Sequence, residues 1–265
     1  MLGAIIGDIV GSRFEFGKPL QLGFQLFVDS PDCDYTDDTI LTIAIADAII
    51  NHRDYGESLY DWGHRYPDPL GCYGTGFGSW LESPNPQPYN SCGNGSAMRV
   101  SPVGWLFHDY HEVMEQARLS AMPSHNHPEG VKGAQCVATI IYWLRTGRMG
   151  RDDVEAAVRH NFGYEIPPLA DINKIGSEGH FDAICQETVP WAVRCFVDSE
   201  NFEDAIRKAV MADGDTDTKA NITGAMAEAY YGIPDDMLDK VVAKLPDDML
   251  DVLEQFLTLV QKEVE

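Results

Sequence analysis

Positive charge is scarce in this sequence. Its 265 residues include 19 Lys and Arg against 42 Asp and Glu, so the formal net charge at pH 7 is −23. A protein face that follows a nucleic-acid backbone needs clustered Lys and Arg side chains. The composition therefore disfavours binding to extended nucleic acid, but it leaves room for a nucleotide held in one small pocket.

Long apolar runs and paired cysteines are missing too. No stretch approaches the roughly 20 apolar residues of a membrane-spanning helix. The apolar segment 1–16 lacks the basic start of a signal peptide and meets Asp8 early. The six cysteines form no C-x-x-C pair, which favours reduced thiols over a disulfide framework or a zinc site. We expect a cytoplasmic protein without membrane contact.

Strand-like alternation is nearly absent, and the segment 22–29, LGFQLFVD, is a weak candidate strand. Helix-length apolar stripes are frequent instead. They predict helices at residues 36–52, 111–122, 130–147, 151–162, 187–199, 201–212 and 249–264. The chain length fits one large domain or two small ones, and no internal repeat or low-complexity linker divides it.

A Gly-, Pro- and Asn-rich segment at about 66–94 interrupts the helices. It is either a domain linker or a long functional loop, and we favour the loop because such segments within compact domains are commonly binding loops or lids. Its stretch YGTGFGSW could hold phosphate oxygens with backbone N–H groups around Gly74 and Gly76. A flexible turn explains it equally well, and the glycine spacing does not match a Rossmann fingerprint.

Two dense acidic clusters each precede a predicted helix. YTDDT, residues 35–39, places Thr36, Asp37 and Asp38 at a helix start, where acidic side chains also complement the helix dipole without any ligand. DGDTDTKANITGA, residues 213–225, has the same organisation. It begins like an EF-hand loop, but the sixth position is Thr218 instead of Gly and the twelfth is Gly224 instead of Glu.

Together the two clusters supply carboxylate and hydroxyl oxygens, which suit Mg²⁺, Mn²⁺ or Ca²⁺ better than zinc. Converging carboxylates would repel one another strongly without a cation. If the clusters meet, residues 36–218 belong to one domain, and the segment 66–94 lies beside a site.

Four motifs in order resemble the ADP-ribosylglycohydrolase family: GDIVGSRFE, YTDDT, GNGSAMRVSPVGW and GDTDTKANITGAMAEAYYG. They lie within residues 3–233, nearly the whole chain. The resemblance implies a single all-α, orthogonally packed domain over 1–265, with two Mg²⁺ or Mn²⁺ ions as cofactors. It implies that the metal ligands are Thr36, Asp37, Asp38, Asp215, Asp217 and Thr218.

The resemblance also implies the remaining site residues. Glu15 would be a mobile carboxylate that assists the reaction, which makes Glu15, Asp37 and Asp215 the catalytic candidates. Ser91 and Asn94 match positions that contact the diphosphate and adenosine side of ADP-ribose, and His125 matches a pocket histidine. We read the nearby His127 as an ordinary helix-start residue.

Two positions depart from the family pattern. The acidic repeat follows Asp213-Gly214 where relatives usually carry Gly-Gly, and Cys92 stands where some relatives carry an aromatic that packs on adenine. Candidate stacking partners in the same segment are Tyr73, Phe77 and Trp80. We interpret Arg99 as a structural residue that pairs with a buried carboxylate.

The resemblance implies a hydrolase that cleaves the glycosidic bond between ADP-ribose and an acceptor such as a protein side chain, a nucleobase or a small molecule. Two alternatives stay open: a binding module for ADP-ribose without turnover, and a dinuclear-metal phosphohydrolase acting on a nucleotide. Complete ligand positions favour the enzyme. The expected partner is ADP-ribose or an ADP-ribosylated substrate, and the expected oligomeric state is a monomer.

Overall fold

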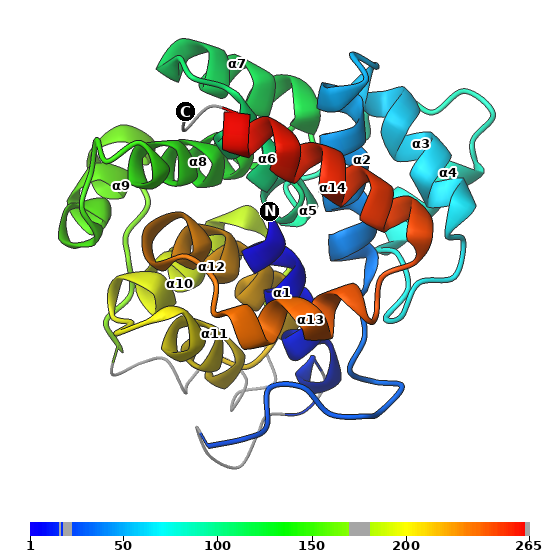
Figure 1. The fold of residues 1–265 in the computed structure, drawn as a ribbon. Coiled ribbons are helices and arrows are strands. Elements are labelled where there is room, and N and C mark those ends of the chain that lie inside the picture. The colour runs from blue at the N-terminus through cyan, green and yellow to red at the C-terminus, as the bar shows by residue number, and fades with distance from the viewer. Residues whose placement is uncertain (16, 18–22, 170–180, 263–265) are drawn as a thin grey trace.

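The computed structural model describes residues 1–15, 17, 23–169 and 181–262. Within these ranges the chain forms helices and connecting loops, with two isolated β-bridges and no strand (Figure 1). The predicted all-α fold is confirmed. The helices are α1 Leu2–Gly11, α2 Asp37–Ile50, α3 Tyr55–Arg65, α4 Thr75–Glu82, α5 Gly95–Met98, α6 Ser101–Leu106, α7 Tyr110–Ala121, α8 Pro128–Arg145, α9 Val154–Phe162, α10 Cys185–Val197, α11 Phe202–Met211, α12 Thr216–Tyr231, α13 Asp235–Val242 and α14 Asp247–Lys262, with 3-10 turns η1 Ser12–Phe14 and η2 Arg151–Asp153.

Helices α1 and α12 form the centre of the fold, and the other helices surround them (Figure 1). All ten residues of α1 are buried. Gly3, Gly7 and Gly11 repeat every four residues, so they share one face of α1. A Cβ added at Gly7 would lie 2.0 Å from the carbonyl oxygen of Ala220 on α12. The glycines therefore allow backbone-to-backbone contact between the two helices.

This contact also fixes the relative register of α1 and α12. Gly3 faces Gly224, Gly7 faces Ala220, and Gly11 faces the first turn of α12. The two helices therefore run antiparallel, and the end of α1 lies beside the start of α12. The acidic first turn of α12 is held against the chain that leads to Glu15.

The amphipathic segments predicted from the sequence form helices at the expected places, from α2 and α7 through to α14. The candidate strand is not formed: residues 23–29 adopt turns and irregular backbone, and residue 22 lies outside the described ranges. Helices α1, α3, α4, α5, α6 and α13 were not predicted. No helix among the described residues is long and apolar enough to cross a bilayer.

The segment 66–94 contains a helix, α4, in its middle. Phe77 and Trp80 of α4 are 6% and 5% exposed and stack with ring centroids 5.2 Å apart. At the start of the segment, Tyr66 donates its hydroxyl to Asp248 of α14 at 2.5 Å. The segment is thus anchored to the helical core on both sides of Gly74, the residue before α4.

Candidate active site

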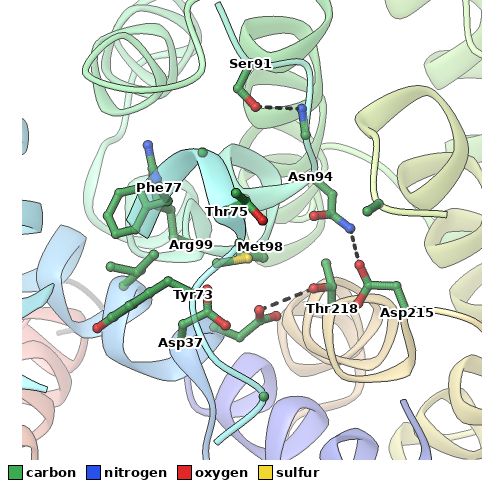
Figure 2. A pocket seen from close by; sticks show the side chains of 18 of the residues that line it. Asp37, Tyr73, Thr75, Phe77, Ser91, Asn94, Met98, Arg99, Asp215 and Thr218 are labelled. Atoms are coloured by element: carbon green, nitrogen blue, oxygen red, sulfur yellow. Dashed lines mark hydrogen bonds between the residues drawn. The ribbon is translucent and has the colours of Figure 1, made fainter. Parts of the chain in front are cut away.

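One cavity of about 330 Å³ opens where α2, α4, α5 and α12 approach one another. Figure 2 shows its walls: Asp37 and Asp215 contribute carboxylates from the starts of α2 and α12, Tyr73 lies close to Asp37, and Phe77 lies farther from Asp215. Of the predicted site residues, the cavity lining includes Glu15, Asp37, Asp38, Gly74, Gly76, Ser91, Asn94, His125, Asp215, Asp217 and Thr218. Among the predicted metal ligands, Thr36 alone is not part of the lining, and it is buried at 1% exposure.

Thr36 caps the N-terminus of α2 and is itself held by α1. Its side-chain oxygen accepts a hydrogen bond from the backbone N–H of Asp38 at 3.2 Å. Its hydroxyl donates to Oδ1 of Asp8 at 2.7 Å, and its backbone N–H donates to Oδ2 at 3.0 Å. Thr39 adds two further donors to the Asp8 carboxylate. Asp8 therefore fixes the first turn of α2 and aims Asp37 and Asp38 at the cavity.

The first turn of α12 meets this turn directly. Thr218 donates its hydroxyl to Oδ1 of Asp38 at 3.2 Å. Asn94, just before α5, donates from Nδ2 to Oδ2 of Asp215 at 2.6 Å (Figure 2). The two acidic clusters that lie far apart in the sequence thus belong to one site, and Asn94 joins them to a third segment.

A buried ion pair supports the start of α12 from behind. Lys219 is fully buried, and its Nζ lies 2.7 and 2.9 Å from the two oxygens of Asp182, which is 1% exposed. Oδ1 of Asp182 also accepts the backbone N–H of Asp215 at 3.2 Å. Removing either partner would leave the other charge buried and unpaired, which is strongly destabilising. The pair therefore holds Asp215 in place.

The turn before α12 explains one departure from the family pattern. Asp213 and Gly214 both have positive φ, 62° and 70°. Gly adopts this region freely, and Asp is among the few other residues found there. Asp213 thus replaces the usual first Gly with the turn retained, and its carboxylate is not part of the cavity lining.

The carboxyl groups from α2 and α12 are unfavourable in their charged forms, because they are buried close to one another. Burial raises the pKa values of Asp37, Asp38 and Asp217 well above the ordinary 3.8, and neighbouring carboxylates raise them further. The ion pair of Lys219 with Asp182 lies behind the site and does not neutralise these groups. Their charged forms need a cation.

The donor set fits a hard divalent cation in part. All candidate ligands are carboxylate or hydroxyl oxygens, which Mg²⁺ and Mn²⁺ prefer. Oδ2 of Asp38 is buried and has no hydrogen-bond partner, so it is a free donor oxygen. As they stand, no three His, Cys, Asp or Glu side chains within the described ranges form a group that could hold an ion. Ion binding would therefore require small movements of these side chains.

Glu15 follows η1 and lies beside the carboxylates. Burial, together with the charges of Asp215 and Asp8, raises its pKa to about 7. A Cβ added at Gly71 would lie 3.2 Å from Oε2 of Glu15, so the segment 66–94 passes close to this carboxyl group. A carboxyl group that titrates near neutral pH can accept or donate a proton during catalysis.

The glycine-rich stretch forms a helix start and not a flexible turn. Gly74 precedes α4, and the cavity lining includes residues 74–77. The first N–H groups of a helix have no partner within the helix, and the helix dipole favours an anion there. The start of α4 thus lies along the cavity, and the holding of phosphate oxygens by its backbone N–H groups stays a prediction.

Two of the three candidate stacking residues line the cavity. Tyr73 and Phe77 are part of the lining, with ring centroids 5.4 Å apart. Trp80 lies behind Phe77 and borders a different groove, near Pro84 and Pro86. Tyr89, which sequence reasoning missed, adds a further aromatic wall.

His125 and Ser91 line the cavity close to Tyr89. His125 is 5% exposed and lies with its ring 6.0 Å from that of Tyr89. Ser91 accepts the backbone N–H of Gly93 at 3.0 Å (Figure 2). His127 caps α8 by accepting the N–H of Glu129 at 3.1 Å, as the sequence predicted.

The predicted partner of Arg99 is wrong. Arg99 is fully buried, but its Nη2 donates to the carbonyl of Ser120 at 3.0 Å and to Oγ of Ser124 at 2.9 Å instead of to a carboxylate. Sequence reasoning also missed Asp8, Asp182 and Lys219. The GD dipeptide at the start of the chain was a signal for Asp8, because an Asp in an otherwise apolar helix requires partners.

A sequence profile described as ADP-ribosylglycohydrolase matches residues 1–264. The chain belongs to the ADP-ribosylglycohydrolase family. Membership confirms the resemblance that the four motifs carried, and it places the chain among hydrolases of ADP-ribosyl groups.

Curated relatives of this ADP-ribosylglycohydrolase agree over most of the chain. ADP-ribosylhydrolase ARH3 of Mus musculus is 26% identical over 308 residues, which cover 88% of this chain and 83% of the relative. ARH3 of Homo sapiens is also 26% identical, with 88% and 84% covered. ADP-ribosylarginine hydrolase Tri1 of Pseudomonas putida is 25% identical, with 95% and 76% covered.

A solved structure shares the fold of this ADP-ribosylglycohydrolase. It is titled "ADP-ribosylglycohydrolase-related protein complex", and it aligns with a TM-score of 0.72 at 20% identity over 98% of this chain and 95% of its own. At this identity the likeness supports the helical fold alone.

Proposed function

We propose that this family member hydrolyses the glycosidic bond between the distal ribose of ADP-ribose and its acceptor, with the help of two Mg²⁺ or Mn²⁺ ions. The observation that carries the proposal is the meeting of α2 and α12, where Thr218 contacts Asp38 at the carboxylate end of one cavity. Family membership supplies the substrate class.

The carboxylates of Asp37, Asp38, Asp215 and Asp217 would hold the ions, with the hydroxyls of Thr36 and Thr218. Bound ions would orient ribose hydroxyls and lower the pKa of a water molecule. Other residues of the protein support these ligands. Asp8 and Lys219 with Asp182 keep the ligand-bearing turns in place from outside the cavity.

Glu15 is our candidate for proton transfer. In the overall reaction the bond from the anomeric carbon to the acceptor breaks, water supplies the new hydroxyl group on that carbon, and a proton goes to the acceptor. A carboxyl group with a pKa of about 7 can take the proton from water and return it to the leaving group. Carboxylates near the anomeric carbon would also stabilise an oxocarbenium-like transition state.

Other residues of the cavity lining suit the ADP portion. The start of α4, at Gly74 and Gly76, offers backbone N–H groups to the diphosphate. Ser91 and His125 add polar groups to the lining. Tyr73 and Phe77 provide flat apolar surface on which adenine could stack.

One incubation series separates this proposal from its two alternatives. Purified protein is mixed with an ADP-ribosylated peptide, Mg²⁺ or Mn²⁺, and the products are identified by mass spectrometry. Release of intact ADP-ribose supports the hydrolase. Saturable binding without release supports a binding module, and AMP or phosphate supports a phosphohydrolase; either result would overturn the proposal.

The acceptor is tested with a panel of substrates. The relative Tri1 is named as a hydrolase of ADP-ribosylarginine, so ADP-ribosylarginine peptide is the first substrate. ADP-ribosylserine peptide, an ADP-ribosylated nucleobase and O-acetyl-ADP-ribose complete the panel. The acceptor with the highest kcat/KM identifies the substrate class.

A further inference from the structure

The hydroxyl group of Ser124 lies between two side chains that constrain its proton. Ser124 is fully buried just after α7, and its Oγ lies 2.9 Å from Nη2 of Arg99. A guanidinium group has only donors. The Ser124 oxygen is therefore the acceptor in this contact, and its own proton is directed elsewhere.

The second neighbour of Ser124 is the imidazole of His125. Oγ of Ser124 lies 2.7 Å from Nδ1, and the side chain forms no other hydrogen bond with a described residue. If Nδ1 carried a proton, the buried hydroxyl proton of Ser124 would have no acceptor, which is costly. Nδ1 therefore accepts, and the neutral ring carries its proton on Nε2.

Nε2 of His125 is directed at the cavity wall formed by two glycines. A Cβ added at Gly95 would lie 2.9 Å from Nε2, and one added at Gly93 would lie 3.4 Å away. No described residue forms a hydrogen bond with Nε2, and His125 is part of the cavity lining. The missing side chains leave this N–H group open to a ligand.

We propose that Arg99 and Ser124 are positioning residues that lock His125 in its neutral Nε2–H form, so that it donates a hydrogen bond to an oxygen of the bound ligand. The ligand part rests on the proposed function, since the phosphate and hydroxyl oxygens of ADP-ribose are suitable acceptors. The assignment of the neutral Nε2–H form rests only on contacts within the protein, between Arg99, Ser124 and His125.

The charge of Arg99 contributes to the lock. Burial lowers the pKa of Arg99 to about 10, so its guanidinium group stays charged at neutral pH. Burial first, and then this charge, lower the pKa of His125 well below its ordinary 6.5. The ring is thus kept neutral as well as oriented.

The first test observes the ring directly in the ligand-free protein. Histidine is labelled with ¹⁵N, and long-range ¹H–¹⁵N spectra distinguish the two neutral forms and the protonated ring; the signals are assigned with His125→Gln. We expect the Nε2–H form in the wild type and a mixture of both neutral forms in Ser124→Ala. An Nδ1–H or protonated ring in the wild type would overturn the proposal, as would an unchanged spectrum in Ser124→Ala.

Ser120→Ala is the matched control. Ser120 is also fully buried near the end of α7, but its hydroxyl donates to the carbonyl of Ala117. The backbone carbonyl that accepts from Arg99 is retained in this variant. The ring of His125 should keep its Nε2–H form. If Ser124→Ala does not fold, the wild-type spectrum decides alone.

The second test measures ADP-ribose binding by calorimetry in the presence of Mg²⁺. We expect Ser124→Ala to bind about tenfold more weakly and Ser120→Ala to bind like the wild type. In the assay for release of ADP-ribose, the KM of Ser124→Ala should change more than its kcat. Equal affinities for all three proteins would overturn the donor role. A wild type that shows the Nε2–H ring but does not bind ADP-ribose would contradict the proposed function and leave the lock supported.

Discussion

Thr218 on α12 donates its hydroxyl to Oδ1 of Asp38 on α2 at 3.2 Å, across a sequence separation of 180 residues. The contact joins the first turns of two helices, each rich in carboxylates. The positive ends of both helix dipoles then face the same carboxylates. Burial, and then neighbouring carboxylates, raise the pKa values of Asp38 and Asp217 in the folded protein.

Asp37→Asn should separate stability from cation binding. Removing one of several repelling buried charges is expected to leave the melting temperature without cation equal or higher. Wild-type protein should be stabilised by added Mg²⁺ or Mn²⁺, by about 2.7 kcal/mol when the free ion is at about 100 times its Kd. The variant should lose most of this gain and all turnover. Thermal unfolding with EDTA or with cation, and release of ADP-ribose, are the measurements.

The control for this experiment is Asp47→Asn, at the other end of α2. Asp47 is a buried carboxylate outside the cavity, and it accepts hydrogen bonds from Asn51, Arg53, Ser58 and Trp62. Its variant should be less stable with and without cation, but its response to the cation should be unchanged. Full activity of Asp37→Asn with Mg²⁺ would contradict the assignment of Asp37 as a ligand.

Gly7→Ala should be among the most damaging single-methyl changes in the protein. The new Cβ would lie 2.0 Å from a backbone oxygen of α12, so the two central helices would have to separate. Overpacking of this kind costs about 3 kcal/mol or more. Activity should fall as well, because α12 carries Asp215 and Asp217 at its start. Urea unfolding measures the stability loss.

Gly78→Ala provides the comparison for that change. Gly78 is also a helical glycine, on α4, but a Cβ there would meet no atom within 4 Å. Its helix should be stabilised by about 0.5–1 kcal/mol. If both variants lost the same stability, close contact between α1 and α12 would not be the reason for Gly7.

Local patterns explain why much of this fold could be predicted. Apolar residues at helical spacing mark α7, α11 and α14, whose buried stripes face the core and whose other faces are polar. The start of α2 is also marked locally, because Thr36 before two Asp residues is a capping signal. Such signals lie within a few residues of one another.

Helix α1 had no such signal. It is buried on every side, so no polar face reveals its period, and its glycines suggest a turn when read alone. Only the partner α12 explains Gly3, Gly7 and Gly11. Helix α1 therefore forms because it packs against α12, which is far away in the sequence, and not because of local helix propensity.

The supporting residues of the site were missed for the same reason. Asp8 acts on Thr36, and Lys219 acts on Asp215 through Asp182; these contacts join separate segments of the chain. The candidate metal ligands could be predicted because they lie close together in two short acidic motifs. An Asp in an apolar segment indicates that Asp8 has partners, but which residues it and Lys219 hold in place is recognised only when the segments are brought together.

The pH dependence of stability should reveal the neutral ring of His125. Burial, and then the charge of Arg99, lower its pKa well below 6.5 in the folded protein. The unfolded chain therefore binds a proton at this residue below about pH 6.5 while the folded protein does not, and stability falls as the pH decreases. Relative to His125→Gln, which cannot titrate, the wild type should lose up to about 1.4 kcal/mol per pH unit.

Urea unfolding of both proteins between pH 7.5 and pH 5 measures this difference. Other titrating groups are common to both chains, so they cancel in the comparison. A constant difference across this range would mean that His125 has the same pKa in the folded and unfolded chains, contrary to its burial.

The aromatic wall gives the last prediction. Tyr73 is only partly buried, lines the cavity and is held by a hydrogen bond from its hydroxyl to the carbonyl of Tyr66 at 2.8 Å. Stacking of a base on an aromatic ring contributes about 1–3 kcal/mol, so Tyr73→Leu should weaken ADP-ribose binding by at least about fivefold. Trp80→Phe should change the affinity less than twofold, because Trp80 lies behind Phe77 and borders another groove. Calorimetric titration of both variants with ADP-ribose is decisive: a larger loss in Trp80→Phe than in Tyr73→Leu would move the adenine site away from this cavity.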